Sequence, residues 1–141
     1  MELLNGIHAL GTTVIRAGAT ADTFNAALFL ATGSLGAGTT SYTSVVGSEV
    51  SGTNYVAGGV VVTNAVTPTS TGTTAYWTPS ANFAWTNVTL STAFNAVLIY
   101  NSSQSGRAVA VYVFGSQTVT AGNFTLTMPT NAAATALLQL N

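Results

Sequence analysis

Charged side chains are almost missing from this chain, which has two basic and three acidic residues among 141. They make up 4% of the sequence, whereas about 25% is usual in globular proteins. Two arginines cannot neutralise a run of phosphates, so nucleic-acid binding is not expected. A net charge of −1 gives almost no repulsion between identical copies, so a free monomer should associate readily.

Cysteine is absent, which excludes disulfide bonds and thiolate chemistry. Long apolar runs are also missing, because none approaches the roughly 20 residues that a membrane-spanning helix needs. The first residues carry Glu2 in place of a basic stretch, and polar residues interrupt any apolar run after it, so no signal peptide is expected. We therefore expect a protein that is made in a cytoplasm and has no membrane partner.

Few groups are suited to catalysis. His8 is the only histidine, and the acids are Glu2, Asp22 and Glu49. A Ser-His-Asp triad is defined by geometry, so spacing alone leaves such a site open, although a lone histidine near a terminus is more often a packing or surface residue. The three acids fall in different predicted elements, which argues against paired carboxylates and against a metal site. The sequence predicts neither an enzyme nor a cofactor.

The most informative stretch runs from Phe94 to Met128. Two apolar runs, 94–100 and 108–114, flank a polar connection that contains glycine, which is typical of a β-hairpin. A third run, 124–128, alternates apolar residues with threonine and predicts a separate strand with one buried face. In the first two runs we expect one set of side chains to face the core and the other set to face a second layer or another subunit. The first set is Val97, Ile99, Val109, Val111 and Val113, and the second is Leu98, Tyr100, Tyr112 and Phe114.

The remaining segments complete a pattern of short strands in one domain, residues 1–141. The expected strands are 26–32, 42–46, 55–63, 73–78, 83–90 and 132–140. Gly58 and Gly59 indicate a bulge or a close approach of two backbones. Roughly seven to nine strands between turn signals predict an all-β antiparallel sandwich or barrel.

The two ends of the chain carry separate signals. Apolar residues recur three and four positions apart near the N-terminus, which predicts a short helix over 2–10 within a helical arm, residues 1–20. Residues 129–141 form a C-terminal strand or a tail, and we favour the strand.

Aromatic residues gather around the turn at Pro79, where Tyr76, Trp77, Phe83 and Trp85 lie close together in sequence. Rings on a β-sandwich can stack on sugar faces, so a carbohydrate-binding module is one interpretation. The alternative is that both tryptophans pack in the core or between subunits, and we favour packing.

Several short motifs follow an order found in a known family. They are Leu-Phe-Leu-Ala-Thr at 28–32, Glu-Val-Ser-Gly-Thr-Asn-Tyr at the start of 49–62, Ser-Ala-Asn-Phe-Ala-Trp at 80–85 and Val-Leu-Ile-Tyr-Asn at 97–101. With them the chain resembles small virion proteins of tailed bacteriophages that are described as decoration, cement or fibre-like proteins. That family also closes with a Val-x-x-Gly-Asp/Asn turn, which residues 119–123 match. The resemblance implies an immunoglobulin-like or jelly-roll sandwich displayed on a virion, commonly as a symmetric oligomer.

One departure from the family lies beside Glu49. The family often has Ala-Arg after the tyrosine that corresponds to Tyr55, whereas this chain has Val56, Ala57 and Gly58. A possible ion pair with Glu49 is thereby removed.

Composition, strand pattern and resemblance together predict a structural virion protein that decorates or cements the capsid shell. A neck, tail or head-fibre component is the first alternative, and a receptor- or glycan-binding module is the second. The expected partners are the major capsid protein or other virion proteins and further copies of this chain, with a host-surface glycan in the last case. A closed homo-oligomer is expected, and a trimer is favoured by analogy with the three-fold positions of an icosahedral shell. The predicted interface residues are Leu3, Ile7, Leu10, Val14, Tyr76, Trp77, Trp85, Tyr100, Tyr112, Phe114, Leu137 and Leu138.

Overall fold

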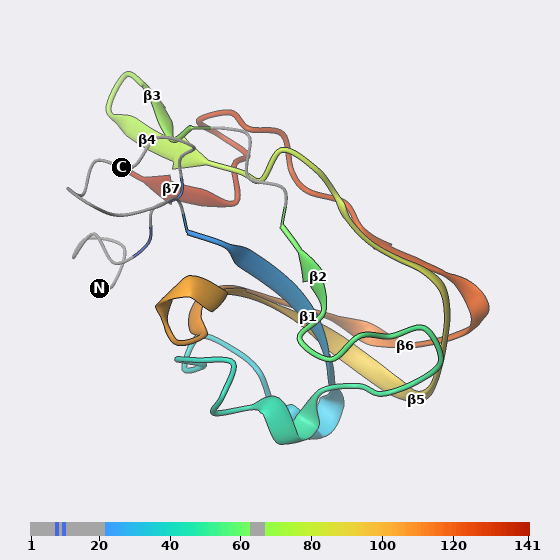
Figure 1. Ribbon diagram of the computed structural model, residues 1–141. Helices are drawn as coiled ribbons and strands as arrows, with labels where there is room; N and C mark the ends of the chain where they lie inside the picture. The colour runs from blue at the N-terminus through green and yellow to red at the C-terminus, as the bar shows by residue number, and fades with distance from the viewer. Residues whose placement is uncertain (1–7, 9, 11–21, 63–66) are drawn as a thin grey trace.

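The computed structural model describes His8, Leu10, residues 22–62 and residues 67–141 (Figure 1). The strands are β1 Phe24–Leu30, β2 Val60–Val61, β3 Thr69–Thr71, β4 Thr74–Trp77, β5 Phe83–Asn101, β6 Arg107–Leu126 and β7 Leu138–Leu140. Short 3-10 turns are η1 Ala31–Gly33, η2 Val46–Ser48 and η3 Ser102–Gln104. The strands form two antiparallel sheets, with the orders β2-β1-β5-β6 and β3-β4-β7. The all-β prediction is therefore confirmed for the described residues.

The hairpin of β5 and β6 is the largest feature of the fold. Figure 1 shows the two strands running side by side, curving at the right of the view and continuing toward the β3-β4-β7 sheet. The turn that joins them consists of η3, then Ser105 and Gly106, which both have positive φ angles of 55° and 69°. The predicted hairpin between the runs 94–100 and 108–114 is thus confirmed.

The prediction of separate strands at 83–90 and 124–128 is wrong, because these runs continue β5 and β6. No proline interrupts either strand. The pairing instead shifts register between Leu90 and Phe94 and again between Phe94 and Ala96. Such bulges bend a strand and increase its twist without ending it, so the hairpin curves where the sequence suggested a turn.

Val109 packs against the main core cluster as predicted, but the predicted faces of β6 are inverted relative to β5 from Ala110 onward. Val97 lies opposite Tyr112, and Leu98 lies opposite Val111. Cross-strand neighbours share a face, so Tyr112 belongs to the same face as Val97, and Val113 is left 60% exposed. A shift of one residue moves every side chain of a strand to the other face. The pattern within each strand was correct, but its register could not be read from the sequence.

The core explains why β1 and β5 are apolar on both faces. The main cluster brings together Phe24 of β1, Trp77 of β4, and Phe94 and Val97 of β5. A second cluster on the opposite face contains Phe29 and Leu98 and is partly covered by side chains of the loop that follows η1. Its members are Ala27, Phe29, Leu35, Ala96, Leu98 and Tyr100, with Tyr42, Val45, Ala108 and Val111 packed against them. Strands buried on both faces have near-continuous apolar runs.

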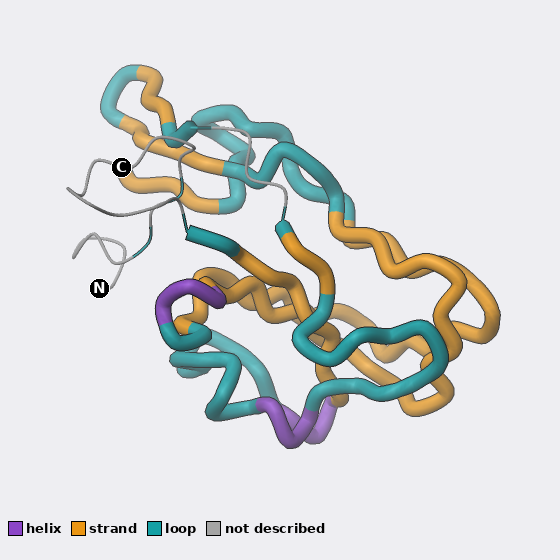
Figure 2. The backbone as a smooth tube through the Cα atoms, viewed as in Figure 1, coloured by secondary structure: helices purple, strands orange, loops and turns teal. Residues whose placement is uncertain are grey.

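The chain between β1 and β2 is almost entirely loop and turn (Figure 2). The prediction of a strand at 42–46 is wrong, because turn bonds such as Val45 N–H to the Tyr42 carbonyl at 3.1 Å curl this segment. The strand predicted at 55–63 is reduced to β2, since the positive φ angles of Gly58 and Gly59, 89° and 74°, break the extended backbone before it.

Predictions at the two ends have different outcomes. The helix over 2–10 lies outside the described residues except for His8 and Leu10, which are both buried. The C-terminal strand is confirmed in part: only Leu138–Leu140 pairs, with β4, and turns precede it. In the described part of the chain, no helix is long and apolar enough to cross a bilayer.

Candidate functional site

The Glu49 carboxylate is the centre of a polar cluster on the loop between β1 and β2. The Tyr42 hydroxyl donates to Oε2 at 2.6 Å, and the Tyr55 hydroxyl donates to Oε1 at 2.7 Å. The backbone N–H of Gly58 donates to Oε1 at 2.8 Å. Three neutral donors, two tyrosine hydroxyls and one backbone N–H, therefore hold the carboxylate.

The cluster also binds the loop to the sheet. The Tyr55 hydroxyl accepts a hydrogen bond from Leu28 N–H in β1 at 3.0 Å. Tyr100 of β5 donates from its hydroxyl to the Gly58 carbonyl at 2.9 Å. Its ring stacks on that of Tyr42, with centroids 4.5 Å apart and planes 17° apart. Glu49 itself forms an antiparallel bridge with Phe29.

Burial and the carboxylate raise the pKa of the two tyrosines that donate to Glu49. For both Tyr42 and Tyr55 the main cause is desolvation, and the hydrogen bond to Glu49 adds to it. Both pKa values lie well above the ordinary value of 10.0. The hydroxyls thus stay protonated and keep donating at neutral pH. Because the folded-state pKa is raised, this stabilisation is complete below pH 10 and is lost as the pH rises through the folded-state pKa values.

This arrangement suits a structural role better than catalysis. A general base or a nucleophile needs a free position beside it for the reacting atom, whereas three donors of the same chain already occupy the Glu49 carboxylate. The sequence analysis identified Glu49 and Tyr55 only as parts of a turn motif. Tyr42 and Tyr100 could not be linked to them from sequence, because nothing local brings these positions together.

A second polar cluster joins His8 to the end of β5. The Asn101 side-chain nitrogen donates to Asp22 Oδ2 at 2.9 Å and lies 3.0 Å from His8 Nδ1. Gln104 donates to the other oxygen of Asp22 at 3.2 Å. Since Asn101 donates to the carboxylate, a second N–H of the same group reaches Nδ1 when histidine is neutral and carries its proton on Nε2.

The structure thus brings the only histidine close to Asp22, but the side-chain amide of Asn101 lies between them. The neighbouring serines are directed elsewhere: Ser102 donates to the Thr23 carbonyl at 2.9 Å, and Ser103 accepts from Thr23 N–H at 2.8 Å. Their hydroxyls hold the start of β1 against the hairpin turn. In the described residues, no group of three metal-ligating side chains is found.

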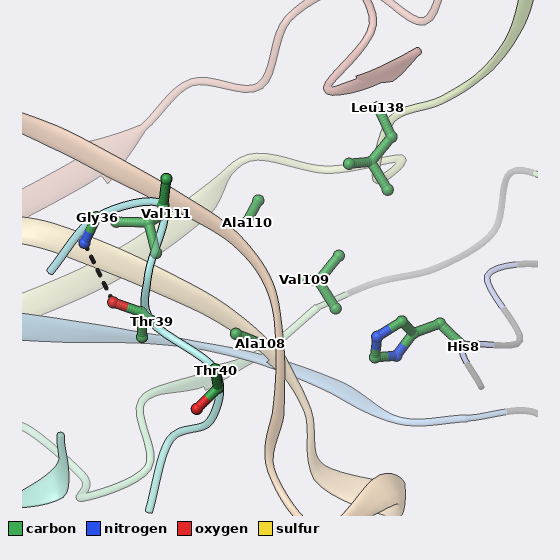
Figure 3. Close-up of a pocket in the computed structure, with 10 residues that line it drawn as sticks. His8, Gly36, Thr39, Thr40, Ala108, Val109, Ala110, Val111 and Leu138 are labelled. Carbon is green, nitrogen blue, oxygen red and sulfur yellow. Dashed lines mark hydrogen bonds between the residues drawn. The ribbon is translucent and has the colours of Figure 1, made fainter. Parts of the chain in front are cut away.

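A groove of about 370 Å³ lies beside the first residues of β6 (Figure 3). Residues 108–111 form one side, residues between Gly36 and Thr40 form another, and His8 and Leu138 complete it. The Gly36 N–H donates to Thr39 Oγ1 at 3.1 Å, which fixes the turn at the edge of the groove. Among the described residues its lining is aliphatic and hydroxyl-bearing, with His8 as the titratable side chain. This chemistry suits an uncharged, extended polypeptide.

The predicted interface residues fall into three groups in the structure. Leu10, Trp77, Trp85 and Tyr100 are buried within a single chain. The half-buried residues are Tyr76, Tyr112, Phe114, Leu137 and Leu138. Leu3, Ile7 and Val14 lie outside the described residues. The half-buried group is the one with surface left to offer, and Tyr112 and Phe114 are adjacent on one face of β6.

Comparison of the chain with protein-family models, with curated proteins and with solved structures finds no match. Support for the virion role that the sequence predicts therefore has to come from the chemistry of the chain's own surfaces.

Replacing Glu49 with leucine is expected to lower the free energy of unfolding by about 3 kcal/mol, because the part-buried Gly58 N–H and the two tyrosine hydroxyls lose their acceptor. Glu49→Gln keeps one acceptor oxygen and should cost only about 1 kcal/mol. Urea unfolding followed by tyrosine and tryptophan fluorescence measures both values. Equal losses in the two variants would show that the hydrogen bonds contribute little.

Proposed function

We propose that this chain is a structural protein of a tailed-bacteriophage virion that decorates or cements the capsid shell through protein–protein contacts. The observation that supports it best is the surface of β6. Its 20 residues include one charged side chain, Arg107, and none of the 20 is fully buried. A long, neutral strand that stays partly exposed suits contact with other proteins.

Two polar clusters strengthen this proposal. The most conspicuous acid, Glu49, and the buried Asp22 are both engaged in hydrogen bonds that hold loops to strands. Two of the five charged residues thus fix the conformation of the chain, and among the described residues Arg107 is the exposed charge on a surface rich in hydroxyl groups. A protein that remains attached to a shell needs such a fixed surface and needs no reactive group.

We further propose that the two sheets pack as a sandwich of the immunoglobulin-like or jelly-roll type. In support, one cluster of buried side chains draws on strands of both sheets, with Phe24 of β1 and Trp77 of β4 only 6.1 Å apart between ring centroids. In the curved hairpin, β5 contributes both Phe83, at its start, and Phe94, near its middle, to the same cluster. A core shared in this way is typical of a sandwich.

The alternatives differ in their support. A neck, tail or head-fibre component would use the same neutral surface, so only its position on the virion differs. A glycan-binding module is less well supported, because Trp77 and Trp85 are buried and leave Tyr76 as the half-exposed ring of the expected platform. Expected partners remain the major capsid protein or another virion protein, together with further copies of the chain.

Virions of the phage whose genome encodes this chain should contain it in a fixed number of copies. Mass spectrometry of gradient-purified particles tests its presence, and cryo-electron microscopy then gives its position. Regular density on the shell supports decoration, and density at the neck, tail or a fibre supports the first alternative. Particles that lack the chain would contradict the structural role altogether.

A further inference from the structure

The outer edge of β6 is open over most of its length. In the four-stranded sheet β6 is an edge strand, paired on one side with β5. On the other side the loop before η2 covers only its beginning: Ala108 N–H donates to the Thr40 carbonyl at 3.0 Å, and Ser41 forms a bridge with Arg107. From residue 109 to residue 126 no strand of the described chain pairs with this edge.

Edge strands of natural proteins usually carry devices that prevent pairing with other chains, such as lysine, proline, inward-pointing charges or very short length. The opposite edge strand, β2, follows this rule because it has two residues. In contrast, β6 has 20 residues, and after Arg107 it contains neither a charged residue nor a proline. Bulges are another such device, and the pairing of β6 with β5 shifts register at residue 109 and again between Val113 and Gln117. The segment between these shifts, Ala110 to Val113, is regular.

Apolar side chains beside this edge are only partly covered. Tyr112, Phe114 and Phe124 pack against the main core cluster but remain half-buried. Phe94 of β5 lies beneath them, fully buried, with ring centroids 6.1 Å from Phe114 and 5.0 Å from Phe124. On the opposite face of the strand, Val113 is 60% exposed. The apolar side chains of this part of the core are thus fully buried on β5 and only partly buried on β6.

We propose that the outer edge of β6 pairs antiparallel with the same edge of a second copy of this chain, in a register centred on Val113. This register places each Tyr112 opposite Phe114 of the other copy, so two aromatic cross-strand pairs extend the half-buried strip. The two exposed Val113 side chains then lie opposite each other and cover one another. Both contacts follow from the same register, because Tyr112 and Phe114 are the neighbours of Val113 on either side.

A second copy fits this edge better than an unrelated partner for two reasons. Neither edge carries charge, so identical strands meet without the repulsion that normally keeps copies of a protein apart. The same pairing also directs the segment from Ser116 to Thr118 of the second copy toward the start of β6, where the groove lined by Thr39 and Thr40 offers hydroxyl and aliphatic surface. Uncharged polar side chains suit this lining.

Self-pairing of one edge is closed by a two-fold axis. This contact therefore gives a dimer, whereas the analogy with an icosahedral shell predicted a trimer. Sedimentation at low micromolar concentration in 1 M NaCl distinguishes the two, since backbone pairing and apolar contacts are hardly screened by salt. We expect a single dimeric species. A monomer or a trimer would overturn the proposal, and neither result depends on whether the chain is found on a virion.

Disulfide capture tests the register directly, because the chain has no cysteine of its own. Opposed residues of an antiparallel pair have Cα atoms about 4.5–5.5 Å apart, which is within the range of a disulfide. Under mild oxidation Val113→Cys should give a covalent dimer. The matched control is Val56→Cys, which is 72% exposed on the loop before β2 and should remain largely monomeric on a denaturing gel. Equal cross-linking of the two variants would overturn the register.

A charged substitution tests the edge itself. Val113→Lys places two ammonium groups opposite each other and should raise the dimer dissociation constant at least about 100-fold. Val56→Lys is the control and should leave the dimer intact. Circular dichroism establishes that both variants are folded, which is expected because both side chains are mainly exposed. A folded Val113→Lys protein that still dimerises like the wild type would contradict the proposal.

Discussion

Gly59→Ala is expected to lower the free energy of unfolding by at least about 3 kcal/mol. Gly59 has a φ of 74°, a left-handed conformation that costs a residue with a Cβ atom about 1–2 kcal/mol. A Cβ added there would also collide with the backbone carbonyl of Ala26 in β1. Neither backbone can move easily, because Gly59 N–H is bonded to the Val56 carbonyl at 2.9 Å and Ala26 lies in the fully buried part of β1.

Gly72→Ala is the matched control for this prediction. Gly72 also has a positive φ, 61°, but a Cβ atom there meets nothing within 4 Å. The loss of stability in Gly72→Ala should therefore measure only the cost of the left-handed conformation, about 1–2 kcal/mol. Chemical denaturation of both variants gives the difference, which isolates the collision with β1. If Gly59→Ala loses no more stability than Gly72→Ala, then the close approach of the two backbones is wrong.

Gly59 also shows what local sequence can reveal. A glycine pair within an apparent strand predicted either a bulge or a close backbone approach, and the structure has the second. The β1 strand, the β4 strand before Pro79 and the hairpin around Gly106 were predicted for the same reason. In each case the conformation is determined by neighbours in sequence, through apolar periodicity or a residue that the backbone requires.

Features that depend on register were not predictable in this way. The period of two along β6 is the same whichever face points inward, so apolar alternation could not decide whether Tyr112 or Val111 lies on the face of Val97. The register shift between Tyr100 and Ile99 decides it, because it inserts Val109 and moves Tyr112 opposite Val97. The curvature of the hairpin was missed for a related reason, because two of the residues with positive φ near its register shifts are not glycine: Asn87 has a φ of 52° and Ala121 a φ of 45°.

The two polar clusters could not be predicted from the sequence, because their members are far apart along the chain. His8 and Asn101 are separated by 93 positions, and Asp22 and Gln104 by 82. Their residue types are common in turns and at strand ends, and no spacing connects them.

Trp77→Ala is expected to lower the free energy of unfolding by about 3–5 kcal/mol. The side chain is 1% exposed and packs against Phe24 of β1, while its backbone pairs with Leu138 of β7. Removing it leaves a large cavity where the two sheets share their core. A loss of this size is a large part of the roughly 5–15 kcal/mol that stabilises a typical domain, so the variant should unfold at much lower urea concentration or fail to fold.

Two further variants serve as controls, and together with Trp77→Ala they separate core packing from glycan binding. Trp77→Phe keeps an aromatic ring in the cavity and should lose clearly less stability than the alanine variant. Tyr76→Ala removes a half-buried ring whose hydroxyl lies 3.2 Å from Thr71 Oγ1, and it should cost less than about 1.5 kcal/mol. Urea unfolding and a glycan array are then run on all three proteins and the wild type. A Trp77→Ala protein that keeps wild-type stability and loses a saturable glycan signal would reverse the assignment, because a ring that supports the core cannot be removed without a loss of stability.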